Sequence, residues 1–225
     1  MTNLRSLMGG LTAYGSVARE SFSPLQCTLF PEEIAYLKDA CPIRRSEFVT
    51  VRRLVSEALA TLDMQRPIMV PSSGGAPTWP PEIVGSLTHC QGYAGAAIAS
   101  RTMVDTIGVD AERNTPVTLP AFRIATNETE RRCLDAVMFE DPVITNRLLL
   151  SAKESAFKAW FPRERGKLLL RDIKVELHSW GTFCASLPIG GKTCSLHYGR
   201  WVRSADLLIT AFVVPSGEWP THDQT

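Results

Sequence analysis

The stretch Ile107-Gly-Val-Asp-Ala-Glu112 decides how the rest of this 225-residue chain is interpreted. Its β-branched residues flank Gly108 and are typical of a buried strand, in which a glycine lets another backbone approach closely. Side chains alternate along a strand, so Asp110 and Glu112 point to the same face, with Cα atoms about 6–7 Å apart. Either both acids are solvated in a polar turn, or a cation lies between them. Oxygen ligands of this kind suit Mg²⁺, with Mn²⁺ as the alternative.

A second informative stretch is the helix predicted over residues 146–161, which Pro162 is expected to end. One stripe of this helix is predicted to be buried, and it consists of Leu149, Ala152, Ala156 and Trp160. Glu154 and Lys158 lie four residues apart on another face. They form either a surface ion pair or a third carboxylate and a cation that face the same site as the acidic strand.

An earlier helix, predicted over residues 43–62 from its apolar spacing, is rich in arginine. Its basic residues are Arg44, Arg45, Arg52 and Arg53. Arg44 and Arg52 are about two turns apart and therefore share a side. This side is either a solvated basic face or a clamp for an anion, because guanidinium groups match phosphate oxygens.

Two strands joined by a tight turn are predicted after a loop rich in proline and glycine. Residues 83–87 form the first strand, which ends at Thr88 and His89, and residues 93–99 form its hairpin partner. A histidine at a strand end beside a hydroxyl residue is either a structural hydrogen-bonding group or a phosphate contact. The residues alone leave both interpretations open.

The remaining pattern predicts an α+β protein with two similar α/β lobes. Asn127 and Glu130 form a capping box that begins a helix reaching about Met138. The strands expected after the 146–161 helix cover residues 173–177, 182–187, 193–201 and 207–214. A long helix followed by a strand pair therefore occurs twice, which indicates an N-terminal lobe of residues 1–105, a C-terminal lobe of residues 106–225 and a site between them.

Composition narrows the classes of function. The chain has 24 basic and 23 acidic residues, and a net charge of +1 gives no broad positive field for nucleic acid. No apolar run approaches the roughly 20 residues of a membrane span. The six cysteines do not form a C-x-x-C pair, so we expect reduced thiols in a cytoplasmic protein.

Four segments in this order resemble the 4′-phosphopantetheinyl transferases, in their longer, two-lobed class. They are RRSEF with VR at residues 44–48 and 51–52, PTWP with GSLTHC at 77–80 and 85–90, IGVDAE at 107–112, and SAKESAFKAW at 151–160. The resemblance covers roughly residues 40–165. It implies transfer of the phosphopantetheine arm of coenzyme A to a serine of apo carrier proteins of fatty acid, polyketide or nonribosomal peptide synthases, with release of 3′,5′-ADP.

The resemblance also implies roles for individual residues. Asp110, Glu112 and Glu154 would surround Mg²⁺ on the pyrophosphate, and Glu154 and Lys158 would be the catalytic residues. Contacts with coenzyme A would come from Arg44, Arg52, Thr88, His89 and Lys158. One departure is Gly74, which stands where the family often has a basic residue, so a phosphate contact from that loop is in doubt.

Two rival functions use the same residues. A metal-dependent pyrophosphohydrolase acting on coenzyme A would need the same three carboxylates, and a non-catalytic module would bind coenzyme A or a carrier without turnover. For the transferase we expect a monomer, with residues 163–174 as a basic carrier-docking segment or a solvated loop. Charge reversal at Arg163 and Arg165 tests this segment through the KM for the carrier and its salt dependence.

Overall fold

The computed structural model describes Leu7 and residues 13–16, 28–72, 75–136, 142–164, 168–189, 192–204 and 206–217. The strands are β1 (Ala13–Ser16), β2 (Ile83–Cys90), β3 (Tyr93–Ser100), β4 (Val104–Arg113), β5 (Lys174–His178), β6 (Thr182–Ile189), β7 (Lys192–Ser204) and β8 (Leu207–Pro215). The helices are α2 (Pro31–Tyr36), α3 (Pro42–Ala60), α4 (Leu119–Ala125), α5 (Glu128–Ala136), α6 (Pro142–Glu164) and the 3₁₀ turn η2 (Leu170–Asp172).

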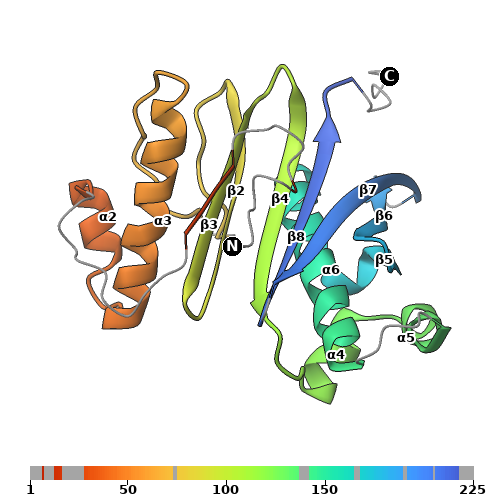
Figure 1. Cartoon of the computed structure of the whole chain (residues 1–225). Coiled ribbons are helices and arrows are strands. Elements are labelled where there is room, and N and C mark those ends of the chain that lie inside the picture. Colours follow the sequence, from red (N-terminus) through yellow and green to blue (C-terminus); the bar gives the residue numbers. More distant parts are fainter. Residues whose placement is uncertain are drawn as a thin grey trace.

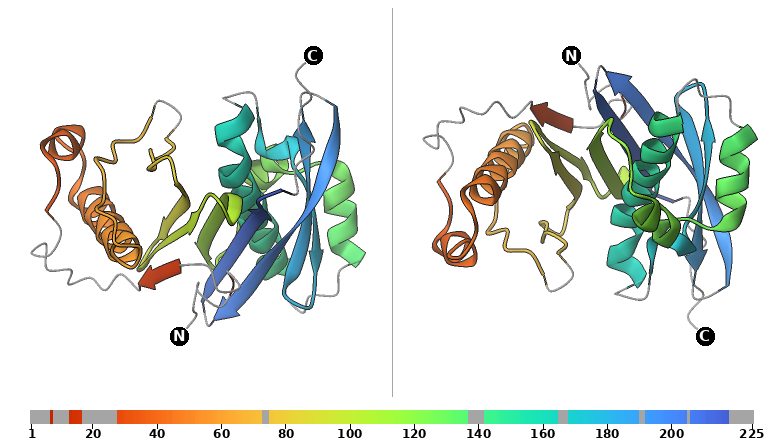
Figure 2. Two further views of the ribbon diagram at one scale, coloured as in Figure 1. Left: turned by 90° about the horizontal axis from the view of Figure 1, so that it is seen from above. Right: turned by 90° about the horizontal axis from the view of Figure 1, so that it is seen from below.

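Two antiparallel sheets stand side by side (Figure 1). The first has the strand order β1-β3-β2, and the second has the order β4-β8-β7-β6-β5. Helix α3 packs on β3 of the first sheet, whereas α6 packs on β4 and β8 of the second. Figure 2 shows that α6 and α5 lie on opposite faces of the five-stranded sheet. The predicted α+β class is confirmed, while the division into lobes at residue 105 stays a prediction.

Hydroxyl side chains join the two sheets where β2 lies beside β4. The backbone N–H of Val109 donates to Ser86 Oγ at 3.0 Å, and the N–H of Ala111 donates to Thr88 Oγ1 at 2.9 Å. These contacts replace the backbone ladder that would otherwise satisfy the edge of β4, since a buried unpaired N–H is costly. The acidic strand is therefore held in register against β2.

Gly108 sets the distance between β4 and α6. A Cβ atom at this position would lie 1.7 Å from the carbonyl oxygen of Ser155 and 2.8 Å from the backbone nitrogen of Ala159. The expectation that Gly108 admits another backbone is confirmed, and that backbone belongs to α6. This contact brings the carboxylates of β4 next to the side chains of α6.

The predicted β2–β3 hairpin, the four later strands and the Asn127 capping box are confirmed. The buried stripe of α6 is also confirmed. The prediction that Pro162 ends α6 was wrong, because the helix continues past this residue to Glu164. A proline inside a helix removes one hydrogen bond and crowds the preceding turn, and here the helix continues despite this cost. Strand β1 and helix α4 were not predicted, since both are short and lack a long apolar period.

Candidate active site

A cavity of about 1330 Å³ lies between the two sheets and is lined by residues from both halves of the chain. Helix α3 and strand β2 contribute basic residues, and β4 and α6 contribute acidic residues. The charged lining residues include Arg44, Arg52, His89, Asp110, Glu154 and Lys158. The tertiary structure thus brings together most of the residues that the sequence singled out.

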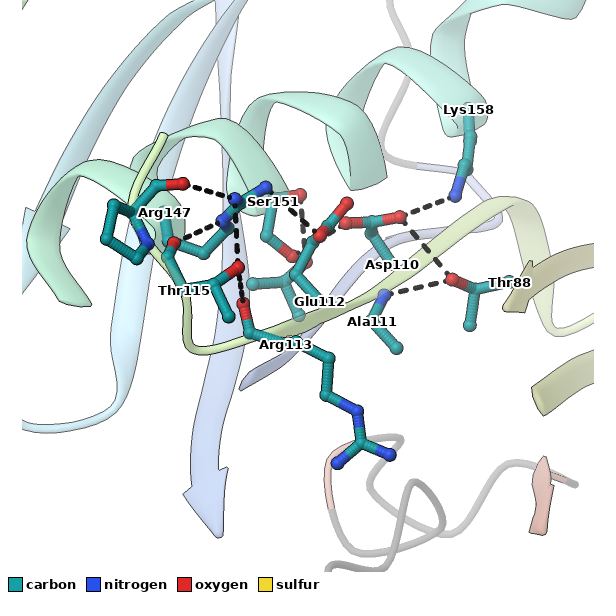
Figure 3. A network of polar contacts seen from close by, with 11 residues as sticks. Thr88, Asp110, Ala111, Glu112, Arg113, Thr115, Arg147, Ser151 and Lys158 are labelled. Carbon is teal, nitrogen blue, oxygen red and sulfur yellow. Dashed lines mark hydrogen bonds and ion pairs between the residues drawn. The ribbon is translucent and has the colours of Figure 1, made fainter. Parts of the chain in front are cut away.

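Asp110 is more enclosed than Glu112 and Glu154, with an exposed fraction of 3%. Figure 3 shows its polar contacts. Its Oδ2 accepts a hydrogen bond from Ser151 Oγ at 2.8 Å. Its Oδ1 accepts from Lys158 Nζ at 2.7 Å and from Thr88 Oγ1 at 3.4 Å. The hydroxyl of Thr210 donates to the carbonyl oxygen of Ser151 at 2.9 Å, which anchors β8 to the same turn of α6. Groups from β2 and α6 therefore hold this carboxylate in place, and β8 supports it indirectly through Ser151.

Glu112 lies two residues farther along β4 and has a different partner. Arg147 Nη1 donates to Glu112 Oε2 at 3.2 Å, and the same guanidinium donates to the carbonyl oxygens of Thr115 and Pro116, each at 3.0 Å. These bonds tie the first part of α6 to the loop after β4 (Figure 3). Burial, followed by the charge of Asp110, raises the pKa of Glu112, although Arg147 acts in the opposite direction.

Glu154 completes a group of three carboxylates. One oxygen atom each from Asp110, Glu112 and Glu154 lies within 4.8 Å of the other two. Burial, followed by the charge of Asp110, raises the pKa of Glu154 to about 7. Carboxylates packed this closely repel one another unless they are protonated or share a cation. A hard divalent cation fits this all-oxygen donor set, so these residues could hold Mg²⁺.

Lys158 is a second cation beside the carboxylates, in addition to Arg147. Its Nζ donates to Asp110 Oδ1 and, at 3.2 Å, to the carbonyl oxygen of Val109. Burial lowers the pKa of Lys158, but the charges of Asp110 and Glu154 more than offset this and the net pKa is raised. The amine is therefore charged and can neutralise negative charge in the cavity.

A second polar group lies on the α3 side of the cavity. Arg44 Nη1 is 3.0 Å from His89 Nε2, and Glu47 Oε2 is 3.3 Å from the same imidazole nitrogen. Burial, opposed by Glu47 and assisted by Arg44, lowers the pKa of His89. Arg44 on α3 and His89 near the end of β2, which were predicted separately as phosphate contacts, are therefore in contact, and both line the cavity.

Arg52 lines the cavity but is far more enclosed than a solvated basic face would be, with an exposed fraction of 4%. Its guanidinium carbon lies 3.5 Å from the centre of the Phe48 ring. It donates to the carbonyl oxygen of Met69 and lies 3.9 Å from a carboxylate oxygen of Glu33. Burial lowers the pKa of Arg52 to about 10, so the side chain remains charged at neutral pH.

Thr88 is 2% exposed, and its hydroxyl is engaged by Ala111 and Asp110. The structure therefore gives Thr88 a positioning role at Asp110, whereas a direct contact with coenzyme A stays a prediction.

Comparison with known proteins assigns this arrangement to a family. Residues 32–99 match the model of the 4′-phosphopantetheinyl transferase N-terminal domain, and residues 106–212 match the model of the 4′-phosphopantetheinyl transferase superfamily. The transferase Svp of Streptomyces mobaraensis is 38% identical over 84% of this chain and 80% of its own length. The chain belongs to the 4′-phosphopantetheinyl transferase family.

Two further relatives have the same kind of name. The 4′-phosphopantetheinyl transferase PptT of Mycobacterium tuberculosis is 33% identical over 85% of this chain and 88% of its own length. Npt of Nocardia iowensis is 31% identical over 80% of this chain and 87% of its own length. As a phosphopantetheinyl transferase, the enzyme uses coenzyme A as substrate and transfers its 4′-phosphopantetheine group to carrier proteins.

Sequence reasoning missed two charged residues near the site of this phosphopantetheinyl transferase. Arg147 carries no motif, and only the structure places it on Glu112. Lys153, in the 151–160 segment, was given no role, but it is fully buried and donates to both oxygens of Glu130 at 2.6 and 2.8 Å. Because Glu130 also accepts from the N–H of Val175, this pair ties α6 to α5 and β5. The spacing between the capping box and the 151–160 segment did not indicate that Lys153 pairs with Glu130.

Two predictions on this transferase cannot be followed in the structure. Gly74, Arg165 and Lys167 lie outside the described residues, as does the side chain of Arg163.

Within the described ranges, no helix is both long enough and apolar enough to cross a membrane.

Proposed function

We propose that this transferase binds Mg²⁺ through Asp110, Glu112 and Glu154 and modifies apo carrier domains of fatty acid, polyketide or nonribosomal peptide synthases. The observation that carries the proposal is the group of three carboxylate oxygens within 4.8 Å of one another, beside a charged lysine, in a cavity between the two sheets. The reaction releases 3′,5′-ADP when a carrier serine attacks the pyrophosphate of coenzyme A.

The donor set supports a magnesium ion over a softer metal. All three groups are carboxylates, which suit Mg²⁺ and, as a second choice, Mn²⁺. Burial, followed by the charge of Asp110, raises the pKa of both Glu112 and Glu154, so their charged forms are disfavoured when no cation is present. When bound, the ion would neutralise charge on the pyrophosphate oxygens. Arg147 and Ser151 would keep the carboxylates of β4 oriented toward it.

Basic groups around the cavity would bind the phosphates of coenzyme A. Lys158 lies beside the carboxylates and is assigned to the pyrophosphate, and Arg44 and His89 lie on the α3 side. Arg52 also lines the cavity, and a guanidinium fork fits a terminal phosphate such as the 3′-phosphate. Because phosphoryl transfer depends mainly on positioning and charge, these contacts would supply much of the catalysis.

Glu154 is also the proposed general base for the carrier serine. A base works best when its pKa lies near the working pH, and the pKa of Glu154 is raised to about 7. The other two acids are held by Arg147, Ser151 and Lys158. A bound cation would lower the pKa of Glu154, so a water molecule between Glu154 and the serine is the alternative route for the proton.

The proposal extends to the setting of the enzyme. We expect a monomer in the cytoplasm, a reducing compartment. The described cysteines Cys41, Cys90, Cys133 and Cys184 are free thiols, which supports this setting.

One experiment tests the function as a whole. The enzyme is incubated with coenzyme A, Mg²⁺ and a panel of apo carrier domains, and the carriers are analysed by intact mass. We expect one phosphopantetheine per carrier and one 3′,5′-ADP. The Asp110→Ala variant, if folded, serves as the inactive control. Release of free 4′-phosphopantetheine without a modified carrier would indicate the hydrolase instead, and binding without turnover would indicate a non-catalytic module.

The Glu154→Gln variant separates the two roles of this residue. It keeps the shape of the side chain and one ligand oxygen but removes the charge and the basic site. We expect most of kcat to be lost while the affinity for coenzyme A stays within several-fold, even at saturating Mg²⁺. If excess Mg²⁺ restores the rate, Glu154 acts as a ligand only.

A further inference from the structure

The turn end of the β5–β6 hairpin gathers a carboxylate, an imidazole and a thiol outside the cavity. Glu176 and Cys184 are direct cross-strand partners, and His178 lies two residues farther along β5, on the same face. One donor atom from each of these residues lies within 4.8 Å of the other two. None of these three residues lines the coenzyme A cavity, so this cluster is separate from the active site.

Two of the distances in the cluster are close to those between the ligands of a tetrahedral metal ion, and the third is at most 4.8 Å. Zinc bonds of about 2.3 Å to sulfur and about 2.0–2.2 Å to nitrogen or oxygen place neighbouring ligand atoms roughly 3.4–3.6 Å apart. Cys184 Sγ lies 3.6 Å from His178 Nε2, and Glu176 Oε1 lies 3.8 Å from the same nitrogen. All three donor atoms therefore lie near enough to share one ion after the side chains adjust.

The imidazole is already oriented for such a role. His178 Nδ1 lies 3.0 Å from Thr182 Oγ1, so a hydrogen bond on this side leaves the Nε2 lone pair facing Cys184 and Glu176. The His178 ring also stacks on Trp180, with centroids 4.6 Å apart. Trp201 Nε1 lies 3.1 Å from the carbonyl oxygens of both His178 and Thr182, which fixes the end of the hairpin. Support of this kind orients histidine ligands in metal sites.

We propose that Glu176, His178 and Cys184 bind one Zn²⁺ ion on the β5–β6 hairpin. Cys184 is buried, His178 is half-buried and Glu176 is exposed, so the fourth ligand position opens to solvent and takes water. A set of sulfur, nitrogen and oxygen donors selects Zn²⁺ over Mg²⁺, whereas the three carboxylates in the cavity have the opposite preference. The ion links two adjacent strands and leaves the transfer reaction to the other site.

Cobalt serves as the spectroscopic probe for this site in the intact, reduced enzyme. The protein is titrated with Co²⁺ in an excess of Mg²⁺, which occupies the carboxylate site. We expect one Co²⁺ per chain to give a near-ultraviolet thiolate-to-cobalt band, and Zn²⁺ to remove this band stoichiometrically. Carboxylates produce no such band, so the signal reports the cysteine site alone.

Variants of the ligands and a matched cysteine control complete the test. Cys184→Ser is expected to abolish the band, and His178→Asn to weaken Co²⁺ binding at least about tenfold. Cys41→Ser, at an exposed cysteine before α3, is expected to leave the band unchanged. Zn²⁺ should also slow the alkylation of Cys184 in the unmodified chain, read by peptide mass, which needs no variant to fold. Absence of the band in the reduced enzyme, its persistence in Cys184→Ser, or unchanged alkylation would overturn the proposal.

Discussion

Replacing Glu154 by Gln tests whether burying this carboxylate next to Asp110 destabilises the enzyme when no cation is bound. The pKa of Glu154 rises from its ordinary value of 4.5 to about 7 in the folded chain. Between these values the folded state holds a proton that the unfolded state has lost. The free energy of unfolding contributed by this group therefore falls as the pH rises from about 4.5 to about 7. Glutamine has no such titration.

The size of the effect follows from the difference in pKa. One pKa unit corresponds to about 1.4 kcal/mol, so the full difference sets an upper value of about 3 kcal/mol. Glu154 is only partly enclosed and borders an open cavity, where water screens its charge. We therefore expect about 1–2 kcal/mol of stability to be lost in the unmodified enzyme between pH 5 and pH 8, relative to Glu154→Gln.

Urea denaturation followed by tryptophan fluorescence, in the presence of a chelator, measures this difference. Saturating Mg²⁺ is expected to restore the lost stability of the unmodified enzyme at pH 8 and to act much less on Glu154→Gln, because binding to the folded state alone raises its stability. Glu82→Gln removes an exposed carboxylate and is the matched control. Parallel pH curves for the unmodified enzyme and Glu154→Gln would refute the reasoning.

Three further predictions follow from the same geometry. Arg147→Ala should raise the Mg²⁺ concentration needed for half-maximal activity about tenfold, a typical effect for residues that orient metal ligands. Arg147→Lys should not restore the metal affinity, because a lysine cannot form all of the same bonds. Unchanged metal dependence would contradict this prediction. Gly108→Ala should destabilise the fold by more than about 3 kcal/mol in urea denaturation, because its Cβ would overlap the backbone of α6. The control Gly75→Ala should cost only about 1 kcal/mol, because a Cβ there meets open space and only the positive φ is unfavourable. Equal losses would show that the close approach of α6 is not decisive. Arg52→Ala should raise the KM for coenzyme A more than that for dephospho-coenzyme A in steady-state assays, and an equal loss for both would mean that Arg52 does not bind the 3′-phosphate.

Much of the secondary structure near the site could be predicted because it depends on local patterns. The alternation in β4 placed Asp110 and Glu112 on one face, and the period of α6 separated its buried stripe from Glu154. The capping box at Asn127 was also local, since both of its hydrogen bonds join residues three apart. Pro162 misled the prediction because a proline inside a helix can kink it without ending it, and α6 continues to Glu164.

The partners of the charged residues could not be predicted from their spacing. The basic helix allowed a solvated face, but Arg52 is buried against Phe48 and near Glu33. Thr88 and His89 are adjacent in sequence, yet Thr88 points into the seam with β4 while His89 faces the cavity beside Arg44. Alternation along a strand predicts that the side chains of Thr88 and His89 point to opposite faces of β2, but it does not predict which residues each one contacts.

The sequence by itself determined the chemical groups of this transferase and the local faces on which they lie, because helix and strand periods are set by the backbone. Only the tertiary structure decided that Glu154 meets Asp110 and Glu112, that Arg147 holds Glu112, and that a thiol and an imidazole meet on the outer hairpin. These side-chain contacts depend on the packing of α6 against Gly108 and on the register of β5 with β6. Such contacts join residues through space, and the spacing of residues along one chain carries no direct record of them.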